Sequence, residues 1–196
     1  LMSASIFSVY YMKLQGGRES LNSNLDSLYR VYLEGKMKMK EDEYFYPDAN
    51  STLRVTYGLV DSYKPRNAVT YRHYTTLHGV FEKVATGVHD YKAPDKLRKL
   101  YQNKDYGRYA AKDNTMHTGF IASNHTSGGN SGSPVLNANG ELIGINFDRN
   151  WEGTMSDLMY DPDQCRNISV DIRYVLFIID KFANADRLIE EMSIVN

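Results

Sequence analysis

The sequence contains one cysteine, Cys165, few histidines and no long apolar run. A single cysteine cannot form an internal disulfide, so no disulfide framework holds this fold. The 5 histidines are scattered, and with Cys165 they do not match the spacing of a structural zinc site. No apolar run approaches the ~20 residues that a membrane-spanning helix needs. The formal net charge of -1 gives no field that favours nucleic acid, and we expect neither a metal ion nor a cofactor.

The 196 residues suffice for one good-sized domain, or for one domain plus an appendage. Hydrophobic residues make up 42% and charged residues 24%, which is ordinary globular composition. The segment from Leu1 to Tyr11 lacks a basic region and a cleavage site, which argues against a signal peptide. It is typical of the middle of a helix, so we expect the chain to be a piece of a larger protein.

The first part of the chain is predicted to be helical. Residues 3–14 and 18–40 have helical character, with Gly16-Gly17 between them. In the second segment apolar residues recur at helical spacing, at Leu21, Leu25, Leu28 and Tyr32. We expect a helical hairpin that packs on the rest of the chain, in preference to a membrane-binding or partner-binding helix.

The remainder is predicted to be mainly β with some helices. Turn chemistry marks residues 46–50, and Asn139-Gly140 is a strong hairpin signal. Pro94 begins a predicted short helix over residues 94–102, a buried apolar segment follows at 170–182, and a closing helix is predicted at 185–192. The predicted strands cover residues 52–58, 69–76, 120–122, 133–136 and 141–147.

One loop carries chemistry, the run GGNSGSP at residues 128–134. Acyl transfer needs an exposed hydroxyl and backbone N–H groups directed at the oxyanion, and glycines permit the tight turn that directs them. Ser131 is the candidate nucleophile, and the N–H groups of Gly129 and Ser131 are the candidate oxyanion hole. The alternative is a turn without chemistry. Pro134, the strand after it and the Asn-Gly turn match the corresponding loop and hairpin of trypsin-fold peptidases, and favour the peptidase.

The spacing of the histidines leads us to expect that the general base is missing from this chain. Trypsin-like triads run His, Asp, Ser, with the His in a first barrel and the Ser in a second. Too few residues separate His78 from Ser131 to complete one barrel and build most of another. His78 is therefore interpreted as a structural residue at a strand end, and we expect the isolated chain to be inactive.

Beyond the loop, the chain resembles the bacterial dipeptidyl-peptidase 7/11 family of serine exopeptidases over nearly its whole length. The resemblance implies the second β-barrel of a trypsin-like double-barrel peptidase, together with a helical hairpin from a capping helical domain. On this view residues 1–44 end the helical cap domain, and residues 45–196 form the C-terminal barrel with closing helices. The catalytic His and Asp are then expected upstream of Leu1. The segments that carry the resemblance are residues 45–52 (FYPDANST), 74–77 (YTTL), 128–136 (GGNSGSPVL) and 170–177 (VDIRYVLF).

Substrate preference is expected to depend on the segment Phe147-Asp148-Arg149. Family members that prefer hydrophobic penultimate residues have Gly at the position of Arg149, and members that cleave after Asp or Glu have Arg. The chain thus resembles the acid-specific type, dipeptidyl-peptidase 11. A guanidinium on this strand can pair with a substrate carboxylate; alternatively, Arg149 caps the strand or pairs with nearby Glu152 or Asp157.

The resemblance also assigns roles to the neighbours of Arg149. Asp148 would bind the free N-terminal amine of the substrate, with Phe147 flanking it, whereas without the family Asp148 is better interpreted as a solvated turn residue. His125 falls where trypsin-fold enzymes place the floor of the specificity pocket. It could donate to the substrate carboxylate or be a packed structural histidine.

Two other functions compete with this one. A heat-shock-type periplasmic endopeptidase has a similar loop, but Ser133 replaces its second Gly, and we expect no peptide-binding domain after the closing helix. A non-catalytic peptide-binding module is the other alternative. By resemblance we expect oligopeptide substrates with a free N-terminus, a homodimer and a periplasmic or cell-surface location, with the missing N-terminal barrel as the structural partner.

Overall fold

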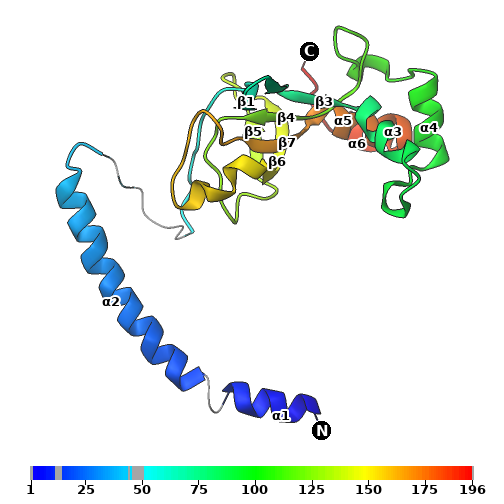
Figure 1. Cartoon of the computed structure of the whole chain (residues 1–196). Coiled ribbons are helices and arrows are strands. Elements are labelled where there is room, and N and C mark those ends of the chain that lie inside the picture. The colour runs from blue at the N-terminus through cyan, green and yellow to red at the C-terminus, as the bar shows by residue number, and fades with distance from the viewer. Residues whose placement is uncertain (1, 12–14, 44, 46–50, 196) are drawn as a thin grey trace. The chain divides into compact units, whose positions relative to one another are not determined.

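The computed structural model describes residues 2–11, 15–43, 45 and 51–195 (Figure 1). The chain divides into two compact units, residues 1–54 and residues 55–196. The first unit contains two helices, and the strands of the described residues lie in the second.

In the first unit, helix α1 spans Met2–Val9 and helix α2 spans Gln15–Met39. The predicted helices are confirmed, but the predicted separator is wrong, because Gly16 and Gly17 lie inside the first turn of α2. Glycine destabilises a helix most in its interior, through the loss of backbone freedom, and these two glycines lie near the helix start. The predicted apolar stripe of α2 is more than half exposed, at 63% for Leu21, 54% for Leu25, 66% for Leu28 and 63% for Tyr32.

The strand predicted at residues 52–58 is wrong. Its apolar positions Leu53, Val55 and Tyr57 are 93%, 81% and 90% exposed, so alternation here does not correspond to a buried face. From Thr56 onward the segment is held by the residues after β4: the Asn124 side-chain amide donates to the carbonyl of Thr56 at 3.2 Å, and Val60 forms an isolated bridge with Ala122. The turn predicted at residues 46–50 lies outside the described residues.

The centre of the second unit is a five-stranded antiparallel sheet in the order β3-β4-β7-β6-β5, whose strands are labelled in Figure 1. It is open, with β3 and β5 at its edges, and β1 and β2 form a separate two-stranded sheet. Its strands confirm the predictions at 120–122, 133–136 and 141–147, while 69–76 divides into two strands. The strands are β1 Tyr63–Arg66, β2 Val69–Tyr71, β3 Tyr74–Thr76, β4 His117–Ala122, β5 Pro134–Leu136, β6 Leu142–Arg149 and β7 Asn167–Asp171.

The hairpin from β5 to β6 forms around the predicted Asn-Gly turn. The N–H of Gly140 donates to the carbonyl of Asn137 at 3.0 Å, and the side chain of Asn137 accepts from the N–H of Asn139 at 2.9 Å. Gly140 has a φ of 81°, a conformation that residues with a Cβ rarely adopt. The hairpin prediction is confirmed, and it sets the position of β6 beside the candidate loop.

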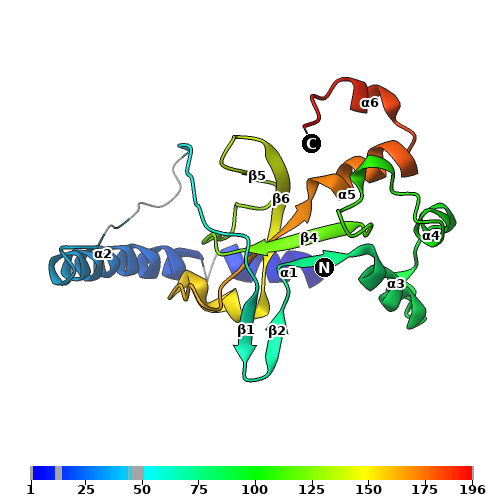
Figure 2. The same ribbon diagram turned by 90° about the horizontal axis from the view of Figure 1, so that it is seen from above.

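Helices gather at one end of this unit, beyond the sheet (Figures 1 and 2). They include α3 Leu77–Ala85, α4 Asp95–Gln102, α5 Ile172–Phe177 and α6 Asp186–Glu190, which confirm the helices predicted at 94–102 and 185–192. The main cluster of buried apolar side chains lies among them and consists of Leu77, Leu97, Tyr106, Tyr109, Met116, Leu176 and Phe177. Each large apolar side chain buried in this way stabilises the fold by about 1.5–3 kcal/mol.

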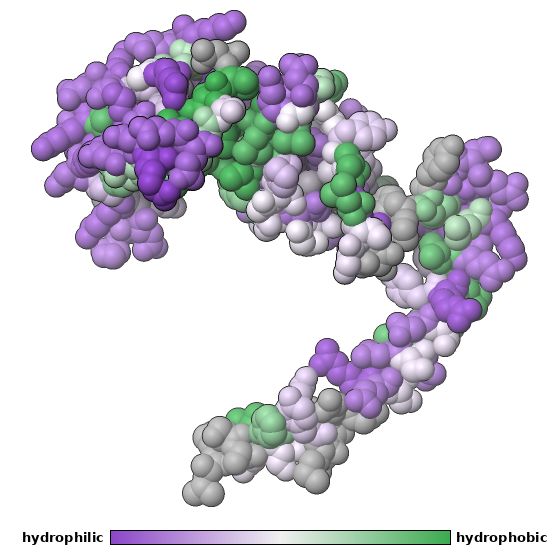
Figure 3. Space-filling view, turned by 180° about the vertical axis from the view of Figure 1, so that it is seen from behind, coloured by the Kyte–Doolittle hydropathy of each residue, from purple (hydrophilic) through white to green (hydrophobic). Residues whose placement is uncertain are grey.

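The sheet end is different in character, because several of its buried residues are polar. Asn146, Asn167, Ser169 and Asp171 are at most 5% exposed. Apolar side chains also gather on one face of the second unit (Figure 3). The apolar core therefore stabilises the helical end, and polar interactions organise the end that carries the candidate loop.

Candidate active site

Ser131 lies on the loop between β4 and β5 and is exposed. Gly129 has a φ of 100° and Gly132 a φ of 84°, so both flanking glycines occupy conformations that other residues rarely adopt. Two backbone hydrogen bonds attach the end of the loop to β6. The N–H of Gly132 donates to the carbonyl of Asn146 at 2.8 Å, and the N–H of Asn146 donates to the carbonyl of Ser133 at 2.9 Å.

The candidate nucleophile and oxyanion-hole groups of this loop form no hydrogen bonds among the described residues, whereas their neighbours do. The N–H of Ser133 donates to Asn130, and that of Asn130 donates to Ser127. Within the described residues, the N–H groups of Gly129 and Ser131 and the hydroxyl of Ser131 have no hydrogen-bond partner. An exposed hydroxyl with free backbone donors beside it is the arrangement that acyl transfer requires.

Two buried asparagines brace the loop, and the sequence analysis missed both. The Asn146 side-chain amide donates to the carbonyl of Asn130 at 3.1 Å, and the Asn167 amide donates to the Asn146 side-chain oxygen at 3.0 Å. The side-chain oxygen of Asn167 accepts from the N–H of Ala122 on β4 at 3.1 Å. These hydrogen bonds connect β4, β6 and β7 to Asn130, the residue before Ser131. They could not be predicted from a local sequence pattern, because the bonded residues come from different segments of the chain.

A β-bulge in β6 positions the three residues after Asn146. In the register with β7, Asn146 faces Ser169 and Asp148 faces Ile168, so Phe147 is the extra residue. A bulge interrupts the alternation of faces. As a result Phe147 and Asp148 are both exposed, whereas Arg149 is partly buried. The Asp148 carboxylate accepts a 2.8 Å hydrogen bond from the N–H of Arg149.

Arg149 pairs with Asp157, one of the alternatives that the sequence leaves open. Its Nη1 and Nη2 atoms donate to the two carboxylate oxygens of Asp157 at 2.8 and 2.6 Å, and Nη1 also donates to the Ser156 hydroxyl at 2.7 Å. The pair raises the pKa of Arg149 and lowers that of Asp157, in each case chiefly through their hydrogen bonds. Glu152 bonds to Tyr63 and Asn150 instead.

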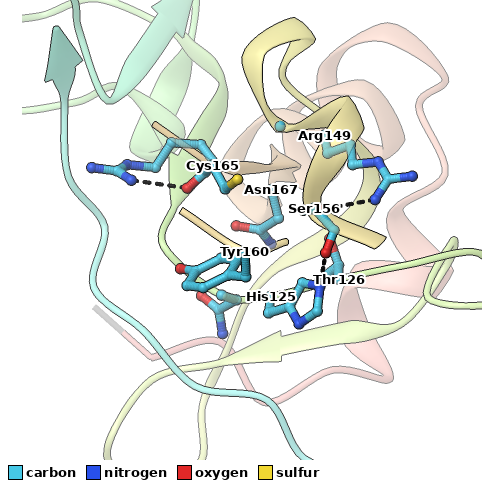
Figure 4. A pocket seen from close by; sticks show the side chains of 10 residues that line it. His125, Thr126, Arg149, Ser156, Tyr160, Cys165 and Asn167 are labelled. Atoms are coloured by element: carbon cyan, nitrogen blue, oxygen red, sulfur yellow. Dashed lines mark hydrogen bonds between the residues drawn. The ribbon is translucent and has the colours of Figure 1, made fainter. Parts of the chain in front are cut away.

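His125 lies next to Arg149 in a small pocket (Figure 4). Its Nε2 lies 3.1 Å from the carbonyl oxygen of Ser156, and its ring packs on Tyr160 with centroids 4.9 Å apart. The pocket has a volume of ≈ 10 Å³, which is room for about one water molecule. The side chains that line it include Arg149, Ser156, Tyr160, Cys165 and Asn167.

Other histidines have partners elsewhere. His78 is the second residue of α3, not a strand end, and its Nδ1 lies 2.7 Å from the Tyr101 hydroxyl. His117 stacks on Tyr74 and contacts Arg173, and burial lowers its pKa.

The two remaining histidines also have partners. His73 contacts Ser62, and His89 contacts Asp90. Among the described residues, the hydrogen bonds of the histidines go to groups other than the Ser131 hydroxyl.

A family model for peptidase S46 matches residues 1–194. The chain belongs to the peptidase S46 family. It is 51% identical over 178 residues to the Asp/Glu-specific dipeptidyl-peptidase of Flavobacterium psychrophilum, covering 91% of this chain and 25% of that protein. It is 46% identical over 196 residues to dipeptidyl-peptidase 7 of Phocaeicola vulgatus, covering 99% of this chain and 27% of that protein.

The fold of this S46 chain also matches a solved relative. The crystal structure of Porphyromonas endodontalis DPP11 in complex with the dipeptide Arg-Glu superimposes with a TM-score of 0.88 at 48% identity, covering 97% of this chain and 28% of that chain. The family resemblance predicted from the sequence is confirmed. The S46 chain spans about a quarter of the length of the relatives it matches.

Neither a metal centre nor a membrane span is found in the described part of the S46 chain. No three His, Cys, Asp or Glu residues lie close enough there to hold a metal ion. Over the same residues, no helix combines the length and the apolar character that crossing a membrane requires.

Proposed function

We propose that this chain is the C-terminal part of a serine dipeptidyl-peptidase that releases N-terminal dipeptides with Asp or Glu at the penultimate position. The observation that carries the acid specificity is the half-buried guanidinium of Arg149. This residue ends β6, the second strand of the hairpin that follows the Ser131 loop. Its side chain is 24% exposed, and it already binds a carboxylate in the geometry that a substrate Asp or Glu would need. The names of the relatives support the same reaction class.

The residues of the loop would divide the reaction as follows. The Ser131 hydroxyl oxygen attacks the carbonyl carbon of the second substrate residue, and its proton passes to a histidine supplied upstream. The N–H groups of Gly129 and Ser131 stabilise the oxyanion. The same histidine returns the proton to the leaving amine, and water then hydrolyses the acyl-enzyme to release the dipeptide.

The groups on β6 would set the length and the specificity of the product. Asp148 is exposed, and its carboxylate can pair with the free N-terminal amine of a peptide, with Phe147 beside it. Arg149 would bind the acidic side chain of the second residue, and His125 would order the floor of that pocket through Ser156. An amine site two residues from the scissile bond limits the product to dipeptides.

We extend the proposal to the protein as a whole. Residues 1–44 would belong to a helical cap domain and residues 45–196 to the second barrel of a trypsin-like double barrel, with the first barrel supplying His and Asp. The open sheet and the apolar face of the second unit suit a domain that packs against further structure (Figure 3). The whole protein would be a homodimer located in the periplasm or at the cell surface.

The full-length protein should cleave a peptide only when its N-terminus is free. A pentapeptide with Asp at position 2 should lose its first two residues, whereas the N-acetylated peptide should be cut at least about a hundredfold more slowly, because blocking the amine removes a charged pair. Mass spectrometry of the products distinguishes the cases. Equal cleavage of both peptides would instead favour an endopeptidase of the heat-shock type.

The isolated chain should have no peptidase activity, because the hydrogen bonds of the histidines among the described residues go to groups other than the Ser131 hydroxyl. It should neither hydrolyse a dipeptidyl reporter nor react rapidly with a fluorophosphonate probe, whereas the full-length protein should do both. Circular dichroism of the isolated chain controls for folding. Fast stoichiometric labelling of Ser131 in the isolated chain would contradict the upstream base.

A further inference from the structure

The guanidinium that the proposed function assigns to the substrate already holds a carboxylate. Both terminal nitrogens of Arg149 bind the two oxygens of Asp157, at 2.8 and 2.6 Å. This is the bidentate geometry in which arginine recognises carboxylates most strongly. Asp157 therefore occupies the edge of Arg149 that a substrate Asp or Glu would use.

Space in the pocket leads to the same point. A volume of ≈ 10 Å³ holds about one water molecule, and an Asp or Glu side chain is several times larger. Figure 4 shows Arg149 and Ser156 at this pocket, with Ser156 linked to both Arg149 and His125. Because both terminal nitrogens of Arg149 are bonded to Asp157, a substrate carboxylate can make the same two hydrogen bonds only if Asp157 moves.

Among the groups around Arg149, Asp157 can move with the smallest loss. Ser156 is buried and hydrogen-bonded through its carbonyl, whereas the Asp157 side chain is 52% exposed. Asp157 is the last residue of the short 3₁₀ helix Trp151–Asp157, and the next residue, Leu158, is 93% exposed. A carboxylate that turns outward here regains water, which offsets part of the loss of its bidentate pair with Arg149.

Retaining both carboxylates would be less favourable. A substrate carboxylate added beside an intact Arg149–Asp157 pair would bring two negative charges to one positive charge in a partly buried site. Two carboxylates that share one guanidinium repel each other. An apolar substrate side chain has no charge with which to displace Asp157, so the resident pair excludes it and admits an acid.

We propose that Asp157 is a specificity-determining residue that occupies Arg149 in the substrate-free enzyme and is displaced by the acidic side chain of the substrate. The inference rests on the proposed function and adds a resident competitor to it. Binding of the acid exchanges one carboxylate for another at Arg149, and the affinity for acidic peptides is reduced by the cost of releasing Asp157.

The test uses the full-length protein with Ser131→Ala, so that binding is measured without turnover. Calorimetry compares the dipeptides Leu-Asp and Leu-Leu. Asp157→Asn keeps the size of the side chain but removes its charge, and should tighten Leu-Asp binding about threefold to tenfold. Binding of Leu-Leu should stay within about twofold. The matched control is Asp163→Asn, an exposed carboxylate further along the same loop, which should change neither.

The outcomes separate the inference from the proposed function. If the parent does not prefer Leu-Asp to Leu-Leu, the acid-specific function fails and the inference fails with it. If the parent prefers Leu-Asp but Asp157→Asn binds it equally or more weakly, the function stands and Asp157 is a positioning residue that holds Arg149. If Asp163→Asn reproduces the gain, the effect is one of net charge and the inference is overturned. Thermal melting of each variant checks the fold.

Discussion

Replacing Ser131 by alanine in the full-length protein should lower kcat/KM by several orders of magnitude while leaving dipeptide binding largely intact. The hydroxyl would form the bond to the substrate carbonyl, so its loss acts on the chemical step and not on ground-state binding. Steady-state kinetics on an Asp dipeptidyl reporter measures the effect. The free hydroxyl and the free N–H groups of Gly129 and Ser131 are the structural basis of this expectation.

Ser133→Ala is the matched control for that experiment. Ser133 lies on the same loop, and its backbone forms its hydrogen bonds to Asn130 and Asn146, so its variant should keep most of the activity. Near-normal turnover of Ser131→Ala would end the serine-peptidase proposal. Equal losses in the two variants would show that the loop tolerates no change of side chain and that Ser131 is not special.

The second large effect is expected at Arg149. In the full-length enzyme, Arg149→Gly should lower kcat/KM for an Asp substrate by roughly thirtyfold to several thousandfold, equivalent to about 2–5 kcal/mol, because the substrate carboxylate is desolvated without a partner. Activity on a Leu substrate should hold steady or rise, since the pocket gains space and loses a charge. Arg149→Lys should recover part of the acid activity, because an ammonium cannot make the bidentate contact.

The ion pair with Asp157 supplies the competing explanation, in which Arg149 only stabilises the loop. A purely structural role would lower activity on both substrates together and would lower the melting temperature. The ratio of kcat/KM for Asp over Leu substrates therefore decides the question. An unchanged ratio in Arg149→Gly would contradict an acid-binding pocket, whatever the absolute activity.

These expectations depend in different degrees on sequence and on structure. The run from Gly128 to Pro134, the Asn-Gly turn and the strand ending at Arg149 are local features. Proline restricts the backbone, and glycine permits the positive φ angles that tight turns need, so the hairpin and the exposed serine could be predicted from the residue types and their spacing alone. The family could also be recognised from such local runs.

Prediction failed where local preference was decided by distant contacts. Residues 52–58 alternate between apolar and polar side chains as a strand does, yet their apolar side chains are exposed. Alternation favours a strand, but a strand forms only where a neighbouring strand pairs with it. Gly16 and Gly17 look like a break but lie in the first turn of α2. In both cases the residues permit two structures, and packing selects one.

The sequence by itself determined the candidate nucleophile, its loop, the hairpin that follows and the family. Tertiary structure alone decided how that loop is held and what occupies Arg149. The bracing asparagines Asn146 and Asn167 come from different strands, and the pairing of Arg149 with Asp157 instead of Glu152 depends on the bulge at Phe147 and the helical turn after β6. Hydrogen bonds and ion pairs form between side chains that the fold brings together, and their geometry is not encoded in the spacing of residues along the chain.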